Sequence, residues 1–291
     1  MSLQNFQSTH KLLYSYKYTW APIEKGYNNR TLYVNVGTGE IKEKPVSATM
    51  KEKFTGGKGF GLKLLWEATK PDTKWNDPEN EIVINTGPIC GITQYSGTGK
   101  SLVVTLSPQT DIPVDSNVGG FFGPFMKFAG FDSLELQGKS DKDVIVLIDE
   151  TREVIEIYEA SNESYDSHLL AEYLTENLAD SEKDRLNVSV VSAGNAADNS
   201  LIGMLNFSFF DAKRKLVRLK QAGRGGIGTV LRDKKIKAVV AHTKGVTGNR
   251  NGVVDLQPIM ERGKIFNKEM RELRSIPAPG VARCARGRAR S

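Results

Sequence analysis

Short runs of β-branched and aliphatic residues, each closed by glycine, proline, asparagine or serine, recur along most of the chain. Runs of about four to eight such residues between turn signals predict β-strands. Stretches in which apolar residues recur with helical spacing are fewer, and most of them separate groups of strands. The sequence therefore predicts an α+β fold with few helices, in which two β-sheets pack together.

The predicted elements lie between residues 32 and 273. Strands are expected at Leu32–Val36, Glu81–Thr86, Leu102–Leu106, Leu134–Gln137, Val144–Ile148, Val154–Ile157, Val188–Val191, Gly203–Phe209 and Ala238–Ala241. Gly37-Thr38-Gly39 predicts a hairpin turn after the first strand. Helices are expected from Ser47, after the turn Gly56–Gly61 with Leu62, Leu65 and Trp66 on the apolar side, over Ser164–Asp180 with Leu169, Leu170, Tyr173 and Leu174 on one face, and from Leu256 to about Leu273.

The segment Gly97-Thr98-Gly99-Lys100-Ser101 is similar to the phosphate-binding loop of nucleotide-binding proteins. Such a loop needs a glycine at the position of Gln94 and a helix directly after the serine. Ser101 is followed instead by Leu102–Leu106, a β-branched run that predicts a strand. The sequence context therefore argues against a nucleotide kinase.

The composition is that of an ordinary soluble globular protein. Hydrophobic residues make up 39% of the 291 residues, and no apolar run is long enough to span a bilayer. The N-terminal residues lack the apolar stretch and the cleavage site of a signal peptide, so we expect a cytoplasmic protein. The two cysteines, Cys90 and Cys284, form neither a disulfide framework nor a CxxC metal pair. We expect Cys90 to be a buried thiol at a strand end.

The net charge of +6 suggests nucleic-acid binding at first sight. However, five arginines lie in the last 18 residues, which contain no acidic residue, and the net charge without them is +1. The body of the chain is thus nearly neutral, and we expect no nucleic-acid partner. This Arg/Ala-rich tail follows a lysine- and glutamate-rich helical pattern; the abrupt change indicates out-of-frame or foreign translation, or else a disordered basic tail.

Three glycine-rich segments lie far apart in the sequence: GGKGFG at 56–61, NVGGFFG at 117–123 and GRGGIG at 223–228. Glycine lets the backbone approach a ligand closely, and successive amides in glycine turns form concave anion sites. The three segments are therefore candidates for lining one cofactor. The alternative is that each is an ordinary turn in a strand-rich protein.

Four sequence blocks together resemble the N-terminal domain of the tungsten-containing aldehyde ferredoxin oxidoreductase family. In order, they are GGKGFGLKLLWE, GPICGITQYSGTGKSLVVTLSP, DSNVGGFFGPFMKFAGFDSLELQGKSD and GRGGIGTVLRDKKIKAVV. The resemblance covers about residues 29–243. It implies a domain of two β-sheets that forms the floor under a tungsten bis-pterin cofactor (tungstopterin). Because dithiolene sulfurs of the pterins hold the metal in that family, the resemblance implies no metal ligand from this chain.

The resemblance also implies eight cofactor-binding residues. Asn117 and Gly119 occupy family positions that contact the pterin, and Lys100 occupies that of an arginine that links the pterin to an iron–sulfur cluster. Lys keeps the charge of that arginine but loses its planar fork of donors. A second pterin-contacting loop is implied for Lys220, Gln221, Ala222, Gly223 and Gly225, where the family commonly has arginine and alanine in place of Lys220 and Gln221.

The activity that the resemblance implies is oxidation of aldehydes to carboxylic acids, with ferredoxin or another electron-transfer protein as the acceptor. The family's cluster cysteines and its catalytic acid and histidine belong to later helical domains. No catalytic residue can therefore be named here, and a [4Fe-4S] cluster is expected only in the intact protein. His10, His168 and His242 match no family site, and we expect surface or sheet-end histidines.

Two alternatives stay open. The sequence at Cys90-Gly91 and at Ser107–Thr110 weakly resembles the related tungsten subunit of the benzoyl-CoA reductase type. The chain could also be a non-catalytic scaffold or binding module. Because catalytic and cluster residues are missing, we expect this chain to be a truncated part of an enzyme that is inactive alone. Its assembly is expected to be a homodimer or a larger complex.

The domain organisation that follows has four parts. Residues 1–28 form an N-terminal extension, residues 29–243 the tungstopterin-binding domain, residues 244–273 the start of the following helical domain, and residues 274–291 the anomalous tail.

Overall fold

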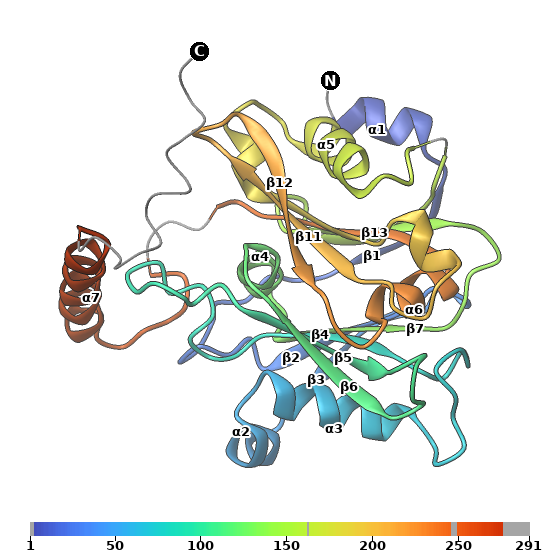
Figure 1. Cartoon of the computed structure of the whole chain (residues 1–291), viewed down its shortest axis with the longest axis horizontal. Coiled ribbons are helices and arrows are strands. Elements are labelled where there is room, and N and C mark those ends of the chain that lie inside the picture. The colour runs from blue at the N-terminus through green and yellow to red at the C-terminus, as the bar shows by residue number, and fades with distance from the viewer. Residues whose placement is uncertain (1–2, 162, 246–248, 276–291) are drawn as a thin grey trace, which may run out of the picture.

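The computed structural model describes residues 3–161, 163–245 and 249–275, and within these ranges the chain forms two mixed β-sheets, one above the other in Figure 1. The described part of the upper sheet runs in the order β1 (Leu12–Lys17), β9 (Val154–Glu159), β8 (Val144–Asp149), β13 (Ile236–His242), β10 (Val188–Ser192), β11 (Leu205–Asp211) and β12 (Leu216–Ala222). The lower sheet runs β3 (Ile41–Pro45), β2 (Arg30–Asn35), β7 (Ser133–Gln137), β4 (Ile82–Asn85), β5 (Ser101–Leu106) and β6 (Pro113–Val118). The pairs β8–β13 and β2–β7 are parallel.

Helices fill the space between the sheets and cover their outer faces (Figure 1). Between the sheets lie α4 (Phe122–Phe128) and α6 (Ile227–Asp233), whose side chains share one apolar core with residues of both sheets. The upper sheet is covered by α1 (Leu3–Thr9) and α5 (Ser167–Leu178), and the lower sheet by α2 (Ala48–Phe54) and α3 (Lys58–Ala68). The remaining described helices are the short η1 (Asp184–Asn187) and η2 (Asn195–Asp198) and the lateral α7 (Gln257–Ser275).

Strand β8 shows why the central strands are apolar throughout. Val144, Val146 and Ile148 belong to the core between the sheets, whereas Ile145 and Leu147 pack in the cluster under α1 and α5. Because side chains alternate between the two faces of a strand, a sheet covered on both faces needs apolar residues at consecutive positions. The run VIVLID therefore marks a strand in the middle of the layered structure.

The predicted α+β fold with two packed sheets is confirmed. The hairpin predicted at Gly37-Thr38-Gly39 joins β2 to β3 in antiparallel register. Ser47 is the N-cap of α2, where its side-chain oxygen accepts a hydrogen bond from the Met50 amide at 3.1 Å. The strands at Leu102–Leu106 and Val144–Ile148 are likewise present, each within one or two residues of the prediction.

Several helices and strands were not predicted, and for one helix, α3, the prediction of which face is buried was wrong. The sequence analysis missed β1, β3, β6, β12, α1, α4 and α6. Strands β3 and β6 are polar edge strands, so they carry little of the apolar signal that identifies a strand. In α3, Trp66 is 81% exposed, while Phe60, Leu64 and Leu65 are buried, and the two leucines pack against β4 and β5 of the lower sheet. The apolar residues of this helix leave two candidate faces, and tertiary packing selects the one that includes Phe60.

The N-terminal residues join the upper sheet. Strand β1 pairs antiparallel with β9, and Phe6 of α1 is fully buried beside Tyr158 with their ring centroids 5.2 Å apart. Among the described helices, none is both long and apolar enough to cross a bilayer.

Candidate functional site

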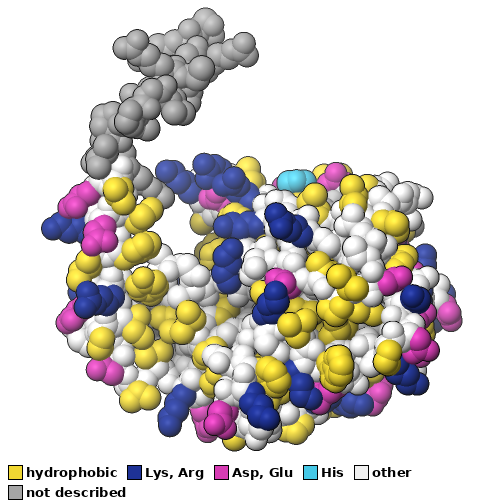
Figure 2. All heavy atoms as spheres, turned by 60° about the horizontal axis from the view of Figure 1, so that its bottom comes forward, with side chains coloured by type: hydrophobic (Ala, Val, Ile, Leu, Met, Phe, Trp, Pro, Cys, Tyr) yellow, Lys and Arg dark blue, Asp and Glu magenta, His cyan; other side chains and the backbone are white. Residues whose placement is uncertain are grey.

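Residues from three separate stretches of the chain line one open cavity with a volume of about 930 Å³. The stretches are the loop 91–100, the end of β6 with the start of α4, and neighbouring positions of β11 and β12. In Figure 1 the loop lies between α7 and the α4 region, and in Figure 2 the surface is hollowed between α7 at the left edge and the body of the molecule. The fold thus assembles a ligand-sized site from segments that are distant in sequence.

The loop that carries Lys100 is closed at its base. The Gly91 amide donates to the carbonyl of Thr98 at 3.0 Å, and the Thr98 hydroxyl donates to the carbonyl of Ile92 at 2.7 Å. Lys100 is exposed, lines the cavity and directly precedes β5. Because a strand follows, no helix N-terminus is available for a phosphate here, which agrees with the argument against a nucleotide-binding loop.

The second wall holds Asn117 and Gly119. Asn117 lies on β6 opposite Leu102 of β5, so the strand pairing fixes it next to the Lys100 loop. A side chain at Gly99 would place its Cβ 2.4 Å from the carbonyl oxygen of Gly120, which means that only glycine allows the two walls to approach so closely. Gly119 itself is open, because the nearest atom to an added Cβ would be Lys220 Nζ at 3.7 Å.

The third wall consists of Lys220 and Gln221, which the sequence analysis placed in a loop. They lie in fact near the end of strand β12, directly before its last residue, Ala222, and pair with Phe207 and Asn206 of β11. Their signal as a strand was weak because LVRLKQA is largely exposed at a sheet edge. Lys220 and Gln221 both line the cavity together with Asn117.

The other three candidate residues do not line the cavity. Ala222 is fully buried in the core, and an added Cβ at Gly223 would meet no atom within 4 Å. Gly225 has a φ of +75°, and a Cβ there would lie 2.4 Å from a methyl carbon of Val114 on β6. Its structural role in this chain is to allow the turn after β12 to pack against β6.

Several cavity residues were not predicted from the sequence. Phe121, Pro124 and Phe128 come from the start and end of α4, and Phe209 and Leu219 come from β11 and β12. Phe121 is 43% exposed, which is unusual for a large aromatic residue. The doubled phenylalanine after the glycines of NVGGFFG was the available signal, since α4 buries only one of the two rings fully.

The cavity is electropositive. Neither Lys100 nor Lys220 forms an ion pair with any residue that the structure describes, and Lys220 Nζ lies 5.8 Å from the ring centroid of Phe209. Unpaired ammonium groups beside exposed aromatic rings favour a ligand that combines negative charge with a flat apolar surface. Within the described residues there is no group of three or more His, Cys, Asp or Glu side chains that could hold a metal ion.

The cysteine and the histidines lie outside this site. Cys90 is buried, as predicted, and burial raises the pKa of its thiol to about 12 in spite of the nearby Lys127. His168 is exposed on α5, in line with the expectation of a surface residue. His10 contradicts that expectation, because it is 3% exposed and pairs with Glu163 under α1.

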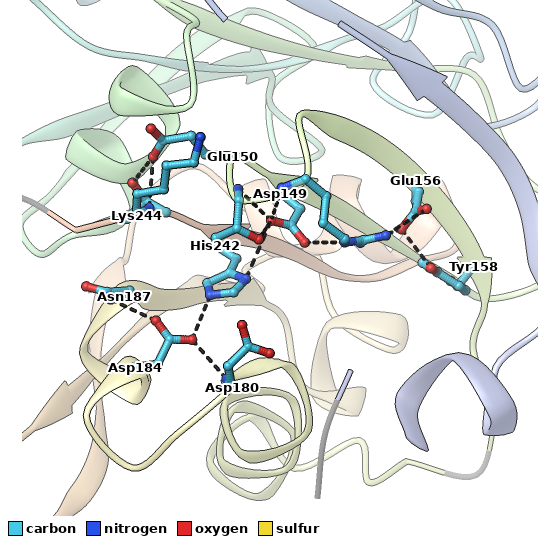
Figure 3. Close-up of polar contacts among 12 residues, drawn as sticks. Asp149, Glu150, Glu156, Tyr158, Asp180, Asp184, Asn187, His242 and Lys244 are labelled. Atoms are coloured by element: carbon cyan, nitrogen blue, oxygen red, sulfur yellow. Dashed lines mark hydrogen bonds and ion pairs between the residues drawn. The ribbon is translucent and has the colours of Figure 1, made fainter. Parts of the chain in front are cut away.

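His242 is the sheet-end residue that the sequence predicted, but it belongs to a buried ionic network (Figure 3). Its Nε2 lies 2.9 Å from a carboxylate oxygen of Asp184, and its Nδ1 lies 3.6 Å from one of Asp149. Burial opposes protonation of this ring, but the hydrogen bonds and charges of the two carboxylates prevail and raise the pKa of His242 to about 9. The network holds the carboxyl ends of β8 and β13 together.

Comparison with known proteins identifies the family. Residues 31–243 match the family model described as "Aldehyde ferredoxin oxidoreductase, N-terminal domain". The chain belongs to the aldehyde ferredoxin oxidoreductase family. The family resemblance noted from the sequence is thereby confirmed, and the matched range contains every residue of the cavity walls.

The similar proteins include tungsten-containing enzymes of Pyrococcus species. The chain is 32% identical over 258 residues to the tungsten-containing aldehyde ferredoxin oxidoreductase of Pyrococcus horikoshii, and 31% identical over 256 residues to that of Pyrococcus furiosus. These matches cover 88% and 86% of this chain but 38% of each relative. The chain therefore spans well under half the length of the curated relatives that it matches.

A solved structure of a different enzyme has the same architecture. The fold matches a chain of the BamBC active-site complex of benzoyl coenzyme A reductase, solved with 1,5-dienoyl-CoA. The TM-score is 0.71 with 27% sequence identity, over 88% of this chain and 36% of that chain.

Proposed function

We propose that this chain is the cofactor-binding region of a tungsten oxidoreductase, and that the cavity is the surface on which a tungsten bis-pterin cofactor lies. The observation that carries the proposal is the convergence of Lys100, Asn117, Gly119, Lys220 and Gln221 on one cavity. All five were selected from sequence by family resemblance, and they come from strands and loops up to 121 positions apart in the numbering. Family membership and the names of the tungsten-containing relatives support the same assignment.

The residues present fit such a group. The cavity is large, open on one side and glycine-rich, and an added Cβ at Gly97 or Gly120 would meet no atom within 4 Å. Flat pterin rings can therefore approach the backbone at these positions, while phosphate groups suit ammonium side chains and exposed amides. When bound, the cofactor would supply the redox-active metal.

The roles of the chain's own residues follow from their chemistry. Lys100 and Lys220 attract and orient anionic groups, each as a compact point charge on a flexible stem. Asn117 presents an exposed side-chain amide that can both donate and accept hydrogen bonds. Phe121 and Phe209 exclude water from the apolar part of the ligand.

For the intact enzyme we propose the oxidation of aldehydes to carboxylic acids, with ferredoxin as the electron acceptor. The support is the match to aldehyde ferredoxin oxidoreductases. Electron transfer to ferredoxin needs a relay, and a [4Fe-4S] cluster requires four thiolates, whereas this chain has only Cys90 and Cys284. We therefore place the cluster and the catalytic groups outside this chain's residues, and expect no aldehyde-dependent reduction of a viologen dye by the chain alone.

A reductase of the benzoyl-CoA type is the second candidate. The observation that favours it is the structural match to the benzoyl coenzyme A reductase complex. Both candidates assign the same cofactor surface to this domain, and they differ in the substrate. Assaying the intact enzyme with aldehydes and with aromatic acyl-CoA thioesters separates them.

The proposal is tested by cofactor content. The chain is produced in a host that makes the bis-pterin cofactor and is grown with tungstate, and the purified protein is analysed for tungsten by mass spectrometry and for pterin by fluorescence after oxidation. We expect both in a ratio of two pterins to one metal. The double variant Lys100→Ala/Lys220→Ala should lose them, whereas Lys70→Ala/Lys213→Ala, which removes two exposed lysines outside the cavity, should not. Absence of both from the unsubstituted protein would favour a non-catalytic scaffold.

A further inference from the structure

A buried lysine lies directly behind one wall of the cavity. Lys127 of α4 has an exposed fraction of 0%, and its Nζ donates to the carbonyl oxygens of Gly87 at 2.6 Å and Pro88 at 3.0 Å. It forms no ion pair with a residue that the structure describes. Both acceptors belong to the segment that leads from β4 into the Lys100 loop.

Arg250 and Asn251, which lie in the segment that follows β13, also donate hydrogen bonds to the loop stem and to the end of α4. Asn251, which is 3% exposed, donates its side-chain amide to the carbonyl of Pro88 at 2.6 Å. Arg250 donates to the carbonyl of Phe128 at 3.2 Å, and its guanidinium carbon lies 4.6 Å from the centroid of the Phe128 ring. Arg250 is itself held by an ion pair with Glu150.

These contacts act on residues that form the cavity. Phe128 lines the cavity, and its ring packs against Gly91, where an added Cβ would lie 2.7 Å from the ring. Directly before Gly91, the Cys90 thiol donates to the carbonyl of Lys100 at 3.8 Å and so joins the two ends of the loop. The position of Lys100 therefore depends on a loop whose stem is fixed at Gly87 and Pro88.

We infer that Lys127, Arg250 and Asn251 form a carbonyl clamp that positions the Lys100 loop and Phe128 for cofactor binding. The three are positioning residues, since none of them lines the cavity. The clamp joins α4, the loop stem and the segment after β13, so that residues beyond the matched family range help to fix the wall. The inference rests on the proposed function for the identity of the ligand.

The chemistry of Lys127 supports a positioning role over a purely stabilising one. Burying an ammonium group without a carboxylate partner is unfavourable, and an apolar side chain of similar size is often as stable or more so. An apolar residue, however, would leave the carbonyl oxygens of Gly87 and Pro88 with fewer donors and free the loop stem to move. Lys127 therefore supplies two hydrogen bonds that fix the loop stem and that no apolar residue of similar size can supply.

The test compares two buried lysines that both donate to carbonyl groups. Lys127→Met removes a clamp donor; Lys234→Met is the matched control, because Lys234 is 1% exposed and donates to the carbonyl of Gly138 at 3.3 Å, away from the cavity lining. Hydrogen exchange of residues 89–100 is measured in both variants, together with tungsten content after growth with tungstate. Asn251→Ala serves as a milder clamp variant that keeps the lysine.

For Lys127→Met we expect amide exchange in residues 89–100 to rise about tenfold or more, with loss of most of the bound tungsten. Lys234→Met should leave both unchanged even where its melting temperature falls. Unchanged loop exchange in Lys127→Met and in Asn251→Ala would overturn the clamp, as would faster loop exchange with tungsten at the parent level. If the parent itself binds no tungsten, the proposed function fails, and the exchange data alone decide whether the clamp holds the loop. Should Lys127→Met not fold, Asn251→Ala decides by the same two measurements.

Discussion

The buried network at His242 and the rim of the cavity both carry basic side chains, but only the first region pairs them. In the network, Asp149 accepts from Arg152 Nε at 2.7 Å, and the imidazole of His242 lies between two carboxylates (Figure 3). At the cavity rim, Lys100 and Lys220 have no carboxylate partner among the described residues.

This difference separates charges that hold the fold from charges available to a ligand. A buried charge must be paired and hydrogen-bonded, or its burial destabilises the protein. An exposed ammonium group carries no such requirement, and leaving it unpaired contributes little to stability. We therefore expect substitutions in the network to change the free energy of unfolding, and substitutions at the rim to change cofactor content.

The largest effects are expected from valine at two candidate glycines. Gly119→Val should abolish tungsten retention with little change in the melting temperature, because its β-branched side chain enters the cavity next to Lys220. Gly225→Val should unfold or strongly destabilise the chain, by about 3 kcal/mol or more, because a positive φ and the clash with Val114 both oppose it. Tungsten content and thermal unfolding of the two variants measure the contrast. Gly194→Ala is the control, because Gly194 has a φ of −73°, an added Cβ would lie no closer than 3.5 Å to another residue, and the position does not line the cavity. Normal tungsten content in Gly119→Val would remove this position from the proposed binding surface.

The next effect concerns the network. His242→Gln should lower the free energy of unfolding by about 3 kcal/mol, because Asp149 and Asp184 would lose a shared cationic partner. Chemical denaturation measures this loss. His168→Gln, at an exposed position of α5, should change stability by less than about 0.5 kcal/mol. Equal stabilities of the two variants would mean that the network does not stabilise the fold.

The same network predicts a pH dependence. The pKa of His242 is raised from 6.5 to about 9, so the protonated ring stabilises the folded state fully below pH 6.5. That contribution decreases as the pH rises and is lost once the pH passes about 9. Denaturation between pH 6 and pH 10 should therefore show falling stability in the parent and a flatter profile in His242→Gln. Parallel profiles would contradict the assignment to His242.

The smallest effect is expected at Lys100. Lys100→Arg should retain the cofactor at least as well, because guanidinium offers more donors in a fixed plane, whereas Lys100→Ala should reduce tungsten content several-fold. Both variants should unfold within about 0.5 kcal/mol of the parent, since the side chain is exposed and unpaired in the described structure. Equal tungsten content in the lysine and alanine forms would assign Lys100 to the turn alone.

Sequence patterns predicted the central strands better than the edges. β8 and β13 are apolar along their length because both faces are covered, and both were found from the sequence. β6 and β12 were missed because edge strands need no apolar partner on each face, yet they carry Asn117, Lys220 and Gln221. The resemblance therefore selected five residues that the structure brings to one cavity, while the strands that hold several of them were not predicted from the sequence.

The sequence by itself determined the α+β class, the two sheets, the cap at Ser47 and the family, because these depend on local periodicity, turn chemistry and the order of motifs. Only the tertiary structure decided which candidate residues meet. It brings Gly119 beside Lys220 and Gly225 against Val114, since strand register and the close approach of separate segments set these neighbours. It also decided that Lys127 is buried with two carbonyl partners, which no local pattern encodes, because the partners lie 39 and 40 positions away along the chain.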